Sequence, residues 1–340
     1  MRAPSTRQTR QTWRRARSLA ALGMSAVVAT AAFVVSAGPV AAASAQKPMM
    51  FGAAASTRVA VQEHEVVLGS RLNGLRVYKS WDSDLFGSSQ TWARDTGHTL
   101  FLSMRSQREN GAIVYWRDIA AARPGSAVYS DLQRQAQQAK AFGATVYVAF
   151  NHEPEARAAW QYGTSAEYVA AYRKVVTVWR AQGVTNVRYV WAATAYGFVR
   201  KDEHRAALYY PGDDVVDDIA ADGYNWYRCR TANGGWRELS DIIEGQRRFG
   251  LLHPSKGLML YEFGSAEDAG MPGHKAQWLR NATQLFQQPG YGQYVAALSW
   301  EGRSFTGGGP SCGFDYLSST SATRAWVDMA HDPAMSATSL

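Results

Sequence analysis

The sequence has few cysteines and no long apolar run after its first 45 residues. Its 340 residues include two cysteines, and neither lies in a recognisable nucleophile motif, so a catalytic cysteine is not expected. No later stretch shows 18 uninterrupted apolar residues, which excludes a protein with several membrane spans. Hydrophobic residues make up 46% and charged residues 19% of the chain, which excludes a disordered chain.

The sequence also lacks pairs of residues at the spacing of metal ligands. The seven histidines are scattered, and no pair has the His-x-x-x-His spacing of a helical metal site. We therefore expect no catalytic metal, and the motifs described below imply no cofactor.

Acidic residues are missing from the start of the chain, where none occurs before Glu63. A run of apolar or small residues spans 19–35, and Ala-Ser-Ala follows at 43–45. This order predicts a secretory signal peptide over residues 1–45, with the twin-arginine and general export routes both open. An amphipathic basic helix on a membrane or RNA is the alternative, disfavoured because the arginines precede the apolar run. Those arginines are Arg2, Arg7, Arg10, Arg14, Arg15 and Arg17.

The formal net charge of +8 suggests a nucleic-acid partner, because a basic surface attracts phosphate. Removing the six charges of the N-terminal segment leaves +2 on residues 46–340. A nucleic-acid binder therefore has little support. We expect a secreted protein that is monomeric and not bound to membrane after cleavage.

Short segments rich in β-branched and aromatic residues alternate with helical patterns. Gly143 and Gly183 follow two of these patterns as stop signals, and Thr164 or Ser165 is a plausible N-cap. Such alternation predicts a parallel sheet, and eight units over 46–340 predict a single (β/α)8 TIM barrel. A doubly wound sheet is disfavoured because no glycine-rich phosphate loop follows the first strand. The expected strands are 50–52, 75–78, 99–104, 144–150, 186–192, 216–223, 257–261 and 294–299; the expected helices are 130–142, 165–182, 236–249 and 275–286, and residues 332–340 are expected to fray.

Two glutamates with distinctive neighbours stand at the ends of expected strands. Glu153 follows the fourth strand and Glu262 the seventh. Active sites of barrels lie at the carboxyl ends of the strands. Glycoside hydrolysis needs two carboxyl groups across the scissile bond, one as proton donor and one as nucleophile in a retaining enzyme. Each glutamate by itself could also be a surface ion-pair partner.

Five short motifs carry a family resemblance. They are Phe150–Pro154, Tyr209–Asp213, Asp222–Asn225, Tyr261–Gly264 and Trp300. Together they resemble glycoside hydrolase family 26, retaining (β/α)8 enzymes that are mostly β-mannanases.

The resemblance implies a role for individual residues. By it, Glu153 is the general acid/base and Glu262 the nucleophile. His152 matches the histidine before the acid/base, Tyr224 a tyrosine bonded to the nucleophile, and Trp300 the aromatic floor under the sugar. Where this sequence has Pro154-Glu155-Ala156, typical mannanases continue with Met-Asn-Gly, which leaves the substrate open.

Tryptophans that follow strands are candidates for stacking against sugar faces. Trp300 is the best placed and Trp226 the next, whereas for Trp81 and Trp160 packing is an equal alternative. Cys229 and Cys312 would lie in loops on the predicted catalytic face, and we expect a disulfide between them.

The sequence thus predicts a secreted retaining β-glycosidase, acting most plausibly on β-1,4-mannan. Its expected partner is a neutral polysaccharide or oligosaccharide. Two alternatives stay open: the same fold acting on another polysaccharide, such as β-1,3-xylan or a bacterial exopolysaccharide, and a non-catalytic barrel that binds glycan.

Overall fold

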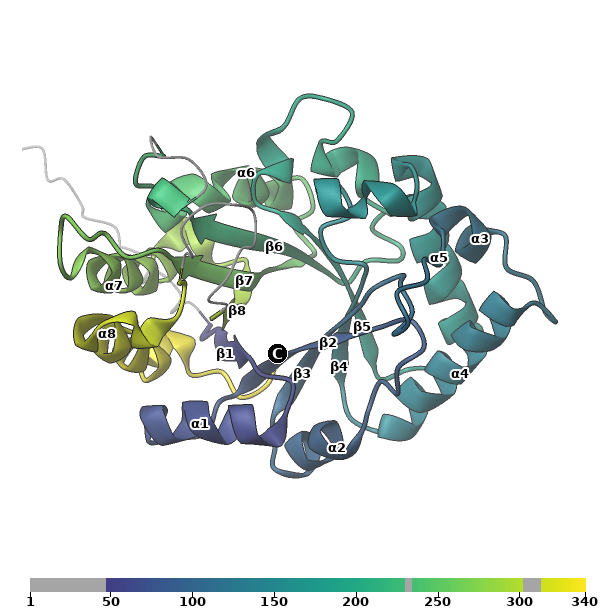
Figure 1. Ribbon diagram of the computed structural model, residues 1–340, viewed down its shortest axis with the longest axis horizontal. Coiled ribbons are helices and arrows are strands. Elements are labelled where there is room, and N and C mark those ends of the chain that lie inside the picture. Colours follow the sequence, from purple (N-terminus) through teal and green to yellow (C-terminus); the bar gives the residue numbers. More distant parts are fainter. Residues whose placement is uncertain (1–46, 230–233, 302–312) are drawn as a thin grey trace, which may run out of the picture. The chain divides into compact units, whose positions relative to one another are not determined.

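Eight parallel strands close into a barrel in the computed structural model, which describes residues 47–229, 234–301 and 313–340. Each strand pairs with the next along the chain, and β8 pairs with β1 (Figure 1). The barrel prediction is confirmed and the doubly wound alternative is wrong. The strands are β1 Met50–Ala54, β2 Gly74–Lys79, β3 Thr99–Met104, β4 Val146–Phe150, β5 Val187–Thr194, β6 Asp218–Asn225, β7 Gly257–Ser265 and β8 Tyr294–Ser299.

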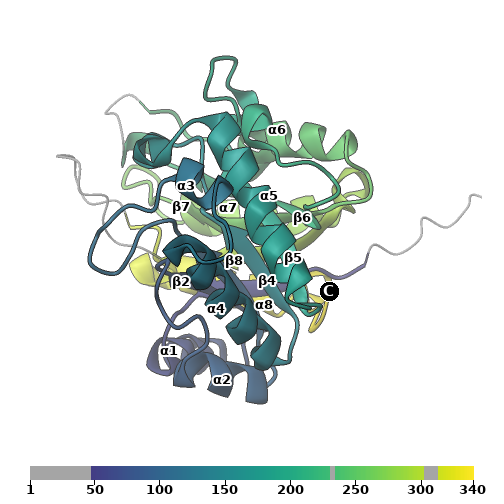
Figure 2. The same ribbon diagram turned by 90° about the vertical axis from the view of Figure 1, so that its right-hand side faces the viewer.

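Helices surround the strands, and Figure 2 shows α4 and α5 along one side of the barrel. Four of these helices match the expected ones, and the other four lie outside the expected ranges. The α-helices are α1 Arg58–Leu68, α2 Ser88–Asp95, α3 Trp116–Ala120, α4 Ala127–Phe142, α5 Ser165–Ala181, α6 Leu239–Leu251, α7 His274–Phe286 and α8 Thr320–Ala330. Short 3-10 helices lie in the loops, among them η1 Arg157–Tyr162 and η2 Gly197–Val199.

Local signals explain where the predicted helices begin and end. The Thr164 hydroxyl accepts from the Glu167 backbone N–H, and the Glu167 carboxylate accepts from the Thr164 N–H, a capping box at the start of α5. Gly143 ends α4 with φ of 72°, a left-handed conformation that favours glycine. The predicted N-cap and stop signals are therefore confirmed.

Apolar side chains of the strands pack in two layers. The barrel interior holds Phe101, Tyr147 and Tyr261, whose rings stack or meet edge to face. A larger cluster lies between strands and helices, and includes Trp179 and Trp326 on α5 and α8. Because the strands are buried on both faces, their sequences read as short apolar runs.

The C-terminal residues differ from the expectation of a frayed tail. Ser336 forms a bridge with Met50 of β1, and the Met49 N–H bonds to the Ala334 carbonyl at 2.8 Å. The Met335 side chain is fully buried. Backbone pairing with β1 therefore orders this segment. None of the helices in the described part of the chain is long and apolar enough to span a bilayer.

Candidate active site

A cavity of about 760 Å³ lies at the carboxyl ends of the strands, the end where barrels place their active sites. Ligand pockets of proteins have volumes of about 300–1,000 Å³, so the cavity can hold an oligosaccharide segment. Its lining comes from β2 and from the loops or ends of β4 to β8, and includes Tyr78, His152, Glu153, Glu155, Asp222, Tyr224, Trp226, Glu262 and Trp300.

Glu262 lies within β7 and is held by two phenols. Tyr78 of β2 donates to Oε1 at 2.7 Å, and Tyr224 of β6 donates to Oε2 at 2.5 Å. The buried guanidinium of Arg76 lies 3.7 Å from Oε1. Two hydrogen bonds and a nearby cation therefore fix the position of this carboxylate. The expected contact between Tyr224 and Glu262 is present, and Tyr78 adds a second donor.

A register shift between β6 and β7 sets this geometry. Ala221 lies opposite Leu260, whereas Asp222 lies opposite Glu262, so Tyr261 is an extra residue in β7. Such bulges re-aim side chains near active sites. As a result Tyr224 and Glu262 can meet although they lie on different strands.

Arg76 brings a positive charge into the barrel beneath the cavity. Its Nη1 donates to Ser103 Oγ at 2.6 Å and its Nε to the Tyr261 carbonyl at 3.2 Å. The guanidinium also lies over the rings of Tyr78 and Tyr261, at 4.7 and 4.1 Å. Burial and the charge of Glu262 raise the pKa of Tyr78 well above its usual value, so this phenol stays protonated and remains a donor.

Glu153 is presented by a strained turn at the end of β4. Its φ is 52° and that of Asn151 is 45°, left-handed conformations that are rare for residues other than glycine. The Asn151 carboxamide oxygen accepts from the backbone N–H and the hydroxyl of Ser106, and the Glu153 N–H bonds to the Ala192 carbonyl at 2.8 Å. Contacts with β5 and with the loop after β3 therefore hold the turn that places Glu153 in the cavity.

His152 and Asp222 lie beside the two glutamates. Burial and the charge of Arg76 lower the pKa of His152 to about 4, so its imidazole is neutral near pH 7. Burial, followed by the charges of Glu262 and Glu153, raises the pKa of Asp222 well above its usual value. Neither Asp222 oxygen has a hydrogen-bond partner among the described residues.

These groups have the spacing of metal ligands. Atoms of His152, Asp222 and Glu262 lie within 4.8 Å of one another. Both Glu262 oxygens already accept phenol hydrogen bonds, and Arg76 lies close by. A metal cation would therefore be repelled by the positive charge of Arg76 and would compete with the phenols for the Glu262 oxygens.

Glu155 is the buried carboxyl next to this site. Its Oε1 accepts from the Thr194 N–H at 2.7 Å and from the Thr194 hydroxyl at 2.5 Å, which ties the β4 loop to the end of β5. Burial raises the pKa of Glu155 to about 7, although the bonds from Thr194 oppose this rise. Its Oε2 has no partner among the described residues.

Two of the four candidate tryptophans line the cavity, Trp226 and Trp300. The Tyr224 ring lies 5.4 Å from the Trp226 ring and 5.7 Å from the Trp300 ring, so an aromatic wall adjoins Glu262. Trp160 is 40% exposed and stacks on His204 at 3.8 Å. It does not line the cavity itself, although its neighbours Arg157 and Ala158 do.

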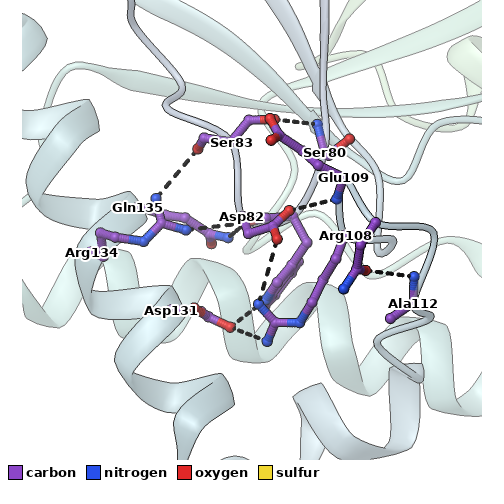
Figure 3. Close-up of polar contacts among 11 residues, drawn as sticks. Ser80, Asp82, Ser83, Arg108, Glu109, Ala112, Asp131, Arg134 and Gln135 are labelled. Atoms are coloured by element: carbon purple, nitrogen blue, oxygen red, sulfur yellow. Dashed lines mark hydrogen bonds and ion pairs between the residues drawn. The ribbon is translucent and has the colours of Figure 1, made fainter.

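Trp81 does not offer a sugar platform, which corrects the expectation for this residue. Its side chain is fully buried, and its Nε1 donates to Asp131 at 2.9 Å. Polar contacts hold the surrounding loops onto α4. Arg108 pairs with Asp131 at 2.6 Å (Figure 3), and Gln135 donates to the Trp81 carbonyl at 2.6 Å. The loop after β2 is therefore held against α4, with the indole buried.

The expected disulfide involves one described cysteine. Cys229 is disulfide-bonded and lies in the loop after β6. Cys312, the expected partner, lies outside the described residues.

Sequence reasoning missed several residues in the cavity wall or directly beneath it. Arg76 is a charge inside an apolar strand, a signal that could have marked it, and Tyr78 follows two positions later. Asp222 belongs to one of the five motifs, but the motif assigned it no role. Tyr196, which lines the cavity and is 66% exposed, stands after β5 in a segment without a recognised motif.

Comparison with known proteins connects this geometry with a family. The catalytic domain of an endo-β-1,4-mannanase of family 26 from Bacillus sp. JAMB-750 covers 85% of this chain and 87% of its own, with TM-score 0.59 and 16% identity. The β-mannanase BoMan26A of the same family from Bacteroides ovatus covers 85% and 90%, with TM-score 0.57 and 15% identity. The chain has the fold of glycoside hydrolase family 26. The resemblance read from the motifs is thus confirmed in the fold.

One curated relative also matches in sequence. Endoglucanase H of Acetivibrio thermocellus is 24% identical over 251 residues, which are 70% of this chain. The match spans only 26% of that enzyme's length. No family model matches the chain.

Proposed function

We propose that this chain is a secreted retaining β-glycoside hydrolase in which Glu262 is the nucleophile and Glu153 the general acid/base. The observation that carries the proposal is the pairing of these carboxyls in one cavity, with Glu262 held by the phenols of Tyr78 and Tyr224. Two strand-end carboxyls beside an aromatic wall match what glycosidic cleavage requires.

The reaction proceeds by double displacement. A Glu262 oxygen forms a bond to the anomeric carbon while the glycosidic bond breaks, and Glu153 gives its proton to the leaving oxygen. Glu153 then takes a proton from water, whose oxygen attacks the anomeric carbon and releases Glu262. The product keeps the β configuration, and both carboxyls return to their starting states.

The neighbours of Glu262 support its role as nucleophile. Tyr78, Tyr224 and Arg76 stabilise a charged carboxylate and fix its orientation. The neutral imidazole of His152 lies near Tyr78, with ring centroids 5.8 Å apart. It adds bulk and polarity to the site without a competing charge.

For the substrate we propose β-1,4-mannan or a related β-glycan. The solved structures with this fold include mannanases, and the curated relative is an endoglucanase. Trp226 and Trp300 supply faces on which sugar rings can stack. The chain departs from typical mannanases at Pro154-Glu155-Ala156, so β-1,3-xylan and bacterial exopolysaccharides belong in the same substrate panel.

We also propose that residues 1–45 are removed during export and that the enzyme works outside the cell as a monomer. The basic start, the apolar run and the Ala-Ser-Ala of 43–45 support export. The proposed partner is a polysaccharide rather than a nucleic acid.

The decisive experiment combines a glycan panel with chemical rescue. Wild type should cleave at least one β-mannan, xylan or glucan, and Glu153→Ala and Glu262→Ala should abolish this cleavage. With an activated aryl β-glycoside and azide, Glu153→Ala should give the β-glycosyl azide and Glu262→Ala the α-glycosyl azide. Identical anomers from both variants would contradict the assigned roles. Binding of glycan without any cleavage by wild type would instead identify a non-catalytic barrel.

A further inference from the structure

Three arginines line the cavity from consecutive loops on one side of the barrel. Arg157 follows β4 at the start of η1, Arg200 follows β5 just after η2, and Arg237 follows β6 just before α6. Glycans without acidic groups offer hydroxyls, for which shorter polar side chains suffice. Guanidinium groups are the side chains suited to planar carboxylates.

Two of the three arginines are not neutralised by a neighbouring carboxylate among the described residues. Arg157 and Arg237 are exposed, and neither guanidinium has an ion-pair partner among the described residues. Arg237 is held in place by neutral groups, because its Nη2 donates to the Asp241 carbonyl at 2.8 Å. Arg200 differs, since Asp202 pairs with it at 2.9 Å through Nε.

Three acidic groups of the cavity, Glu155, Asp222 and Glu262, are buried, whereas Arg157 and Arg237 are exposed. Glu262 faces the buried charge of Arg76 and two phenol donors. Burial raises the pKa of Glu155 to about 7 and raises the pKa of Asp222 well above its usual value, so both carry less negative charge than free carboxyls.

An aromatic side chain accompanies the arginines. Tyr196 lines the cavity after β5 and is 66% exposed. The Arg200 guanidinium carbon lies 5.6 Å from the centre of its ring. A ring for stacking and cations for a carboxylate together form the elements of a subsite for an acidic sugar.

We propose that this side of the cavity binds a carboxylate-bearing sugar residue, with Arg157 and Arg237 as its specificity-determining cations and Tyr196 as its platform. The inference rests on the proposed hydrolase function and narrows its substrate to an acidic β-glycan. The carboxylate belongs to a uronic acid or to a pyruvate ketal. This differs from the neutral glycan that the overall charge of the chain suggested.

The test uses one polysaccharide in two forms. A β-linked glucuronomannan is compared with the same polymer after chemical reduction of its carboxyls to primary alcohols, and a pyruvylated β-glycan provides the second source of carboxylate. Binding is measured by affinity electrophoresis with Glu262→Ala, and kcat/KM with the enzyme whose Glu262 is intact. We expect kcat/KM to be at least tenfold higher, and binding at least tenfold tighter, for an acidic form than for the reduced form. This difference should shrink at high salt because exposed charges are screened.

Variants then separate the arginines from general surface charge. Arg157→Gln and Arg237→Gln should each lower kcat/KM on the acidic polymer about 3- to 10-fold and change it less than twofold on the reduced polymer. Arg280→Gln is the matched control, because Arg280 is an exposed arginine on α7 that bonds only to Gln277 among the described residues. It should change neither value.

The outcomes distinguish the two proposals. Equal cleavage of both forms, or equal losses in Arg157→Gln on both, would overturn the acidic-sugar subsite and leave the hydrolase function standing. Arginine-dependent binding of the acidic form without cleavage of any polymer would uphold the subsite and overturn hydrolysis. If wild type neither binds nor cleaves any form, both proposals fail.

Discussion

Glu155→Gln should make the protein more stable in mildly alkaline solution and reduce the pH dependence of its unfolding. Glu155 is 1% exposed, and burial raises its pKa from an ordinary value of 4.5 to about 7. Between these two values the unfolded chain releases the proton while the folded chain keeps it. Stability therefore falls as pH rises through this window and levels off above pH 7.

The magnitude follows from the two pKa values. A carboxyl shifted from 4.5 to about 7 costs the folded state roughly 3 kcal/mol once it is ionised in both states. Most of this cost develops between pH 5 and pH 8, so the wild-type unfolding free energy should fall by about 2–3 kcal/mol more than that of Glu155→Gln. Glutamine keeps the oxygen that accepts from Thr194 and cannot ionise. Any cost of its amide group is the same at both pH values and cancels in the slope.

The assay is urea unfolding at several pH values without reductant, with linear extrapolation to water. Asp328→Asn is the control, because Asp328 is exposed and has no ion-pair partner among the described residues, so its loss should leave the slope unchanged. Equal slopes for wild type and Glu155→Gln would refute the reasoning, since they would mean that Glu155 ionises in the fold as freely as in water.

Three further predictions concern the site. Tyr224→Phe should lower kcat about 10- to 100-fold with little change in KM, because a hydrogen bond to a charged group contributes about 1.5–3 kcal/mol; an unchanged kcat would contradict the role of this phenol. Trp81→Ala should lower the unfolding free energy by about 3–5 kcal/mol, whereas Trp226→Ala should weaken glycan binding with a smaller loss of stability; the reverse pattern would show the two assignments to be wrong. Thiol labelling of the denatured, non-reduced exported protein should find neither Cys229 nor Cys312 free, and two labelled thiols would rule out the bond.

The strands and the order of the barrel were predictable because their signals are local. Short apolar segments, Gly143 and the Thr164 cap each depend on a few neighbouring residues, and the structure has them at the expected places. The segment after residue 331 was expected to fray because its sequence has no pattern of its own. Its order depends on pairing with β1, which lies far away in the sequence.

Trp81 and Trp226 show the limit of predicting side-chain environments from local sequence. Both follow a strand, so the sequence treats them alike. The loop around Trp81 is held onto α4 by Asp131 and Gln135, and the indole is buried, whereas Trp226 faces the cavity. Contacts between residues about 50 positions apart determine whether the indole is buried. Such contacts cannot be predicted from the spacing of residues in the sequence.

By itself the sequence determined the alternation of strands and helices, the location of Glu153 and Glu262 toward the carboxyl-terminal end of the barrel, and the motifs that resemble family 26. The tertiary structure decided which groups surround those carboxyls. A one-residue shift between β6 and β7 brings Tyr224 to Glu262, and barrel closure brings Arg76 beneath it. The electrostatics of a site depend on distance and burial, and these exist only once all eight strands have closed.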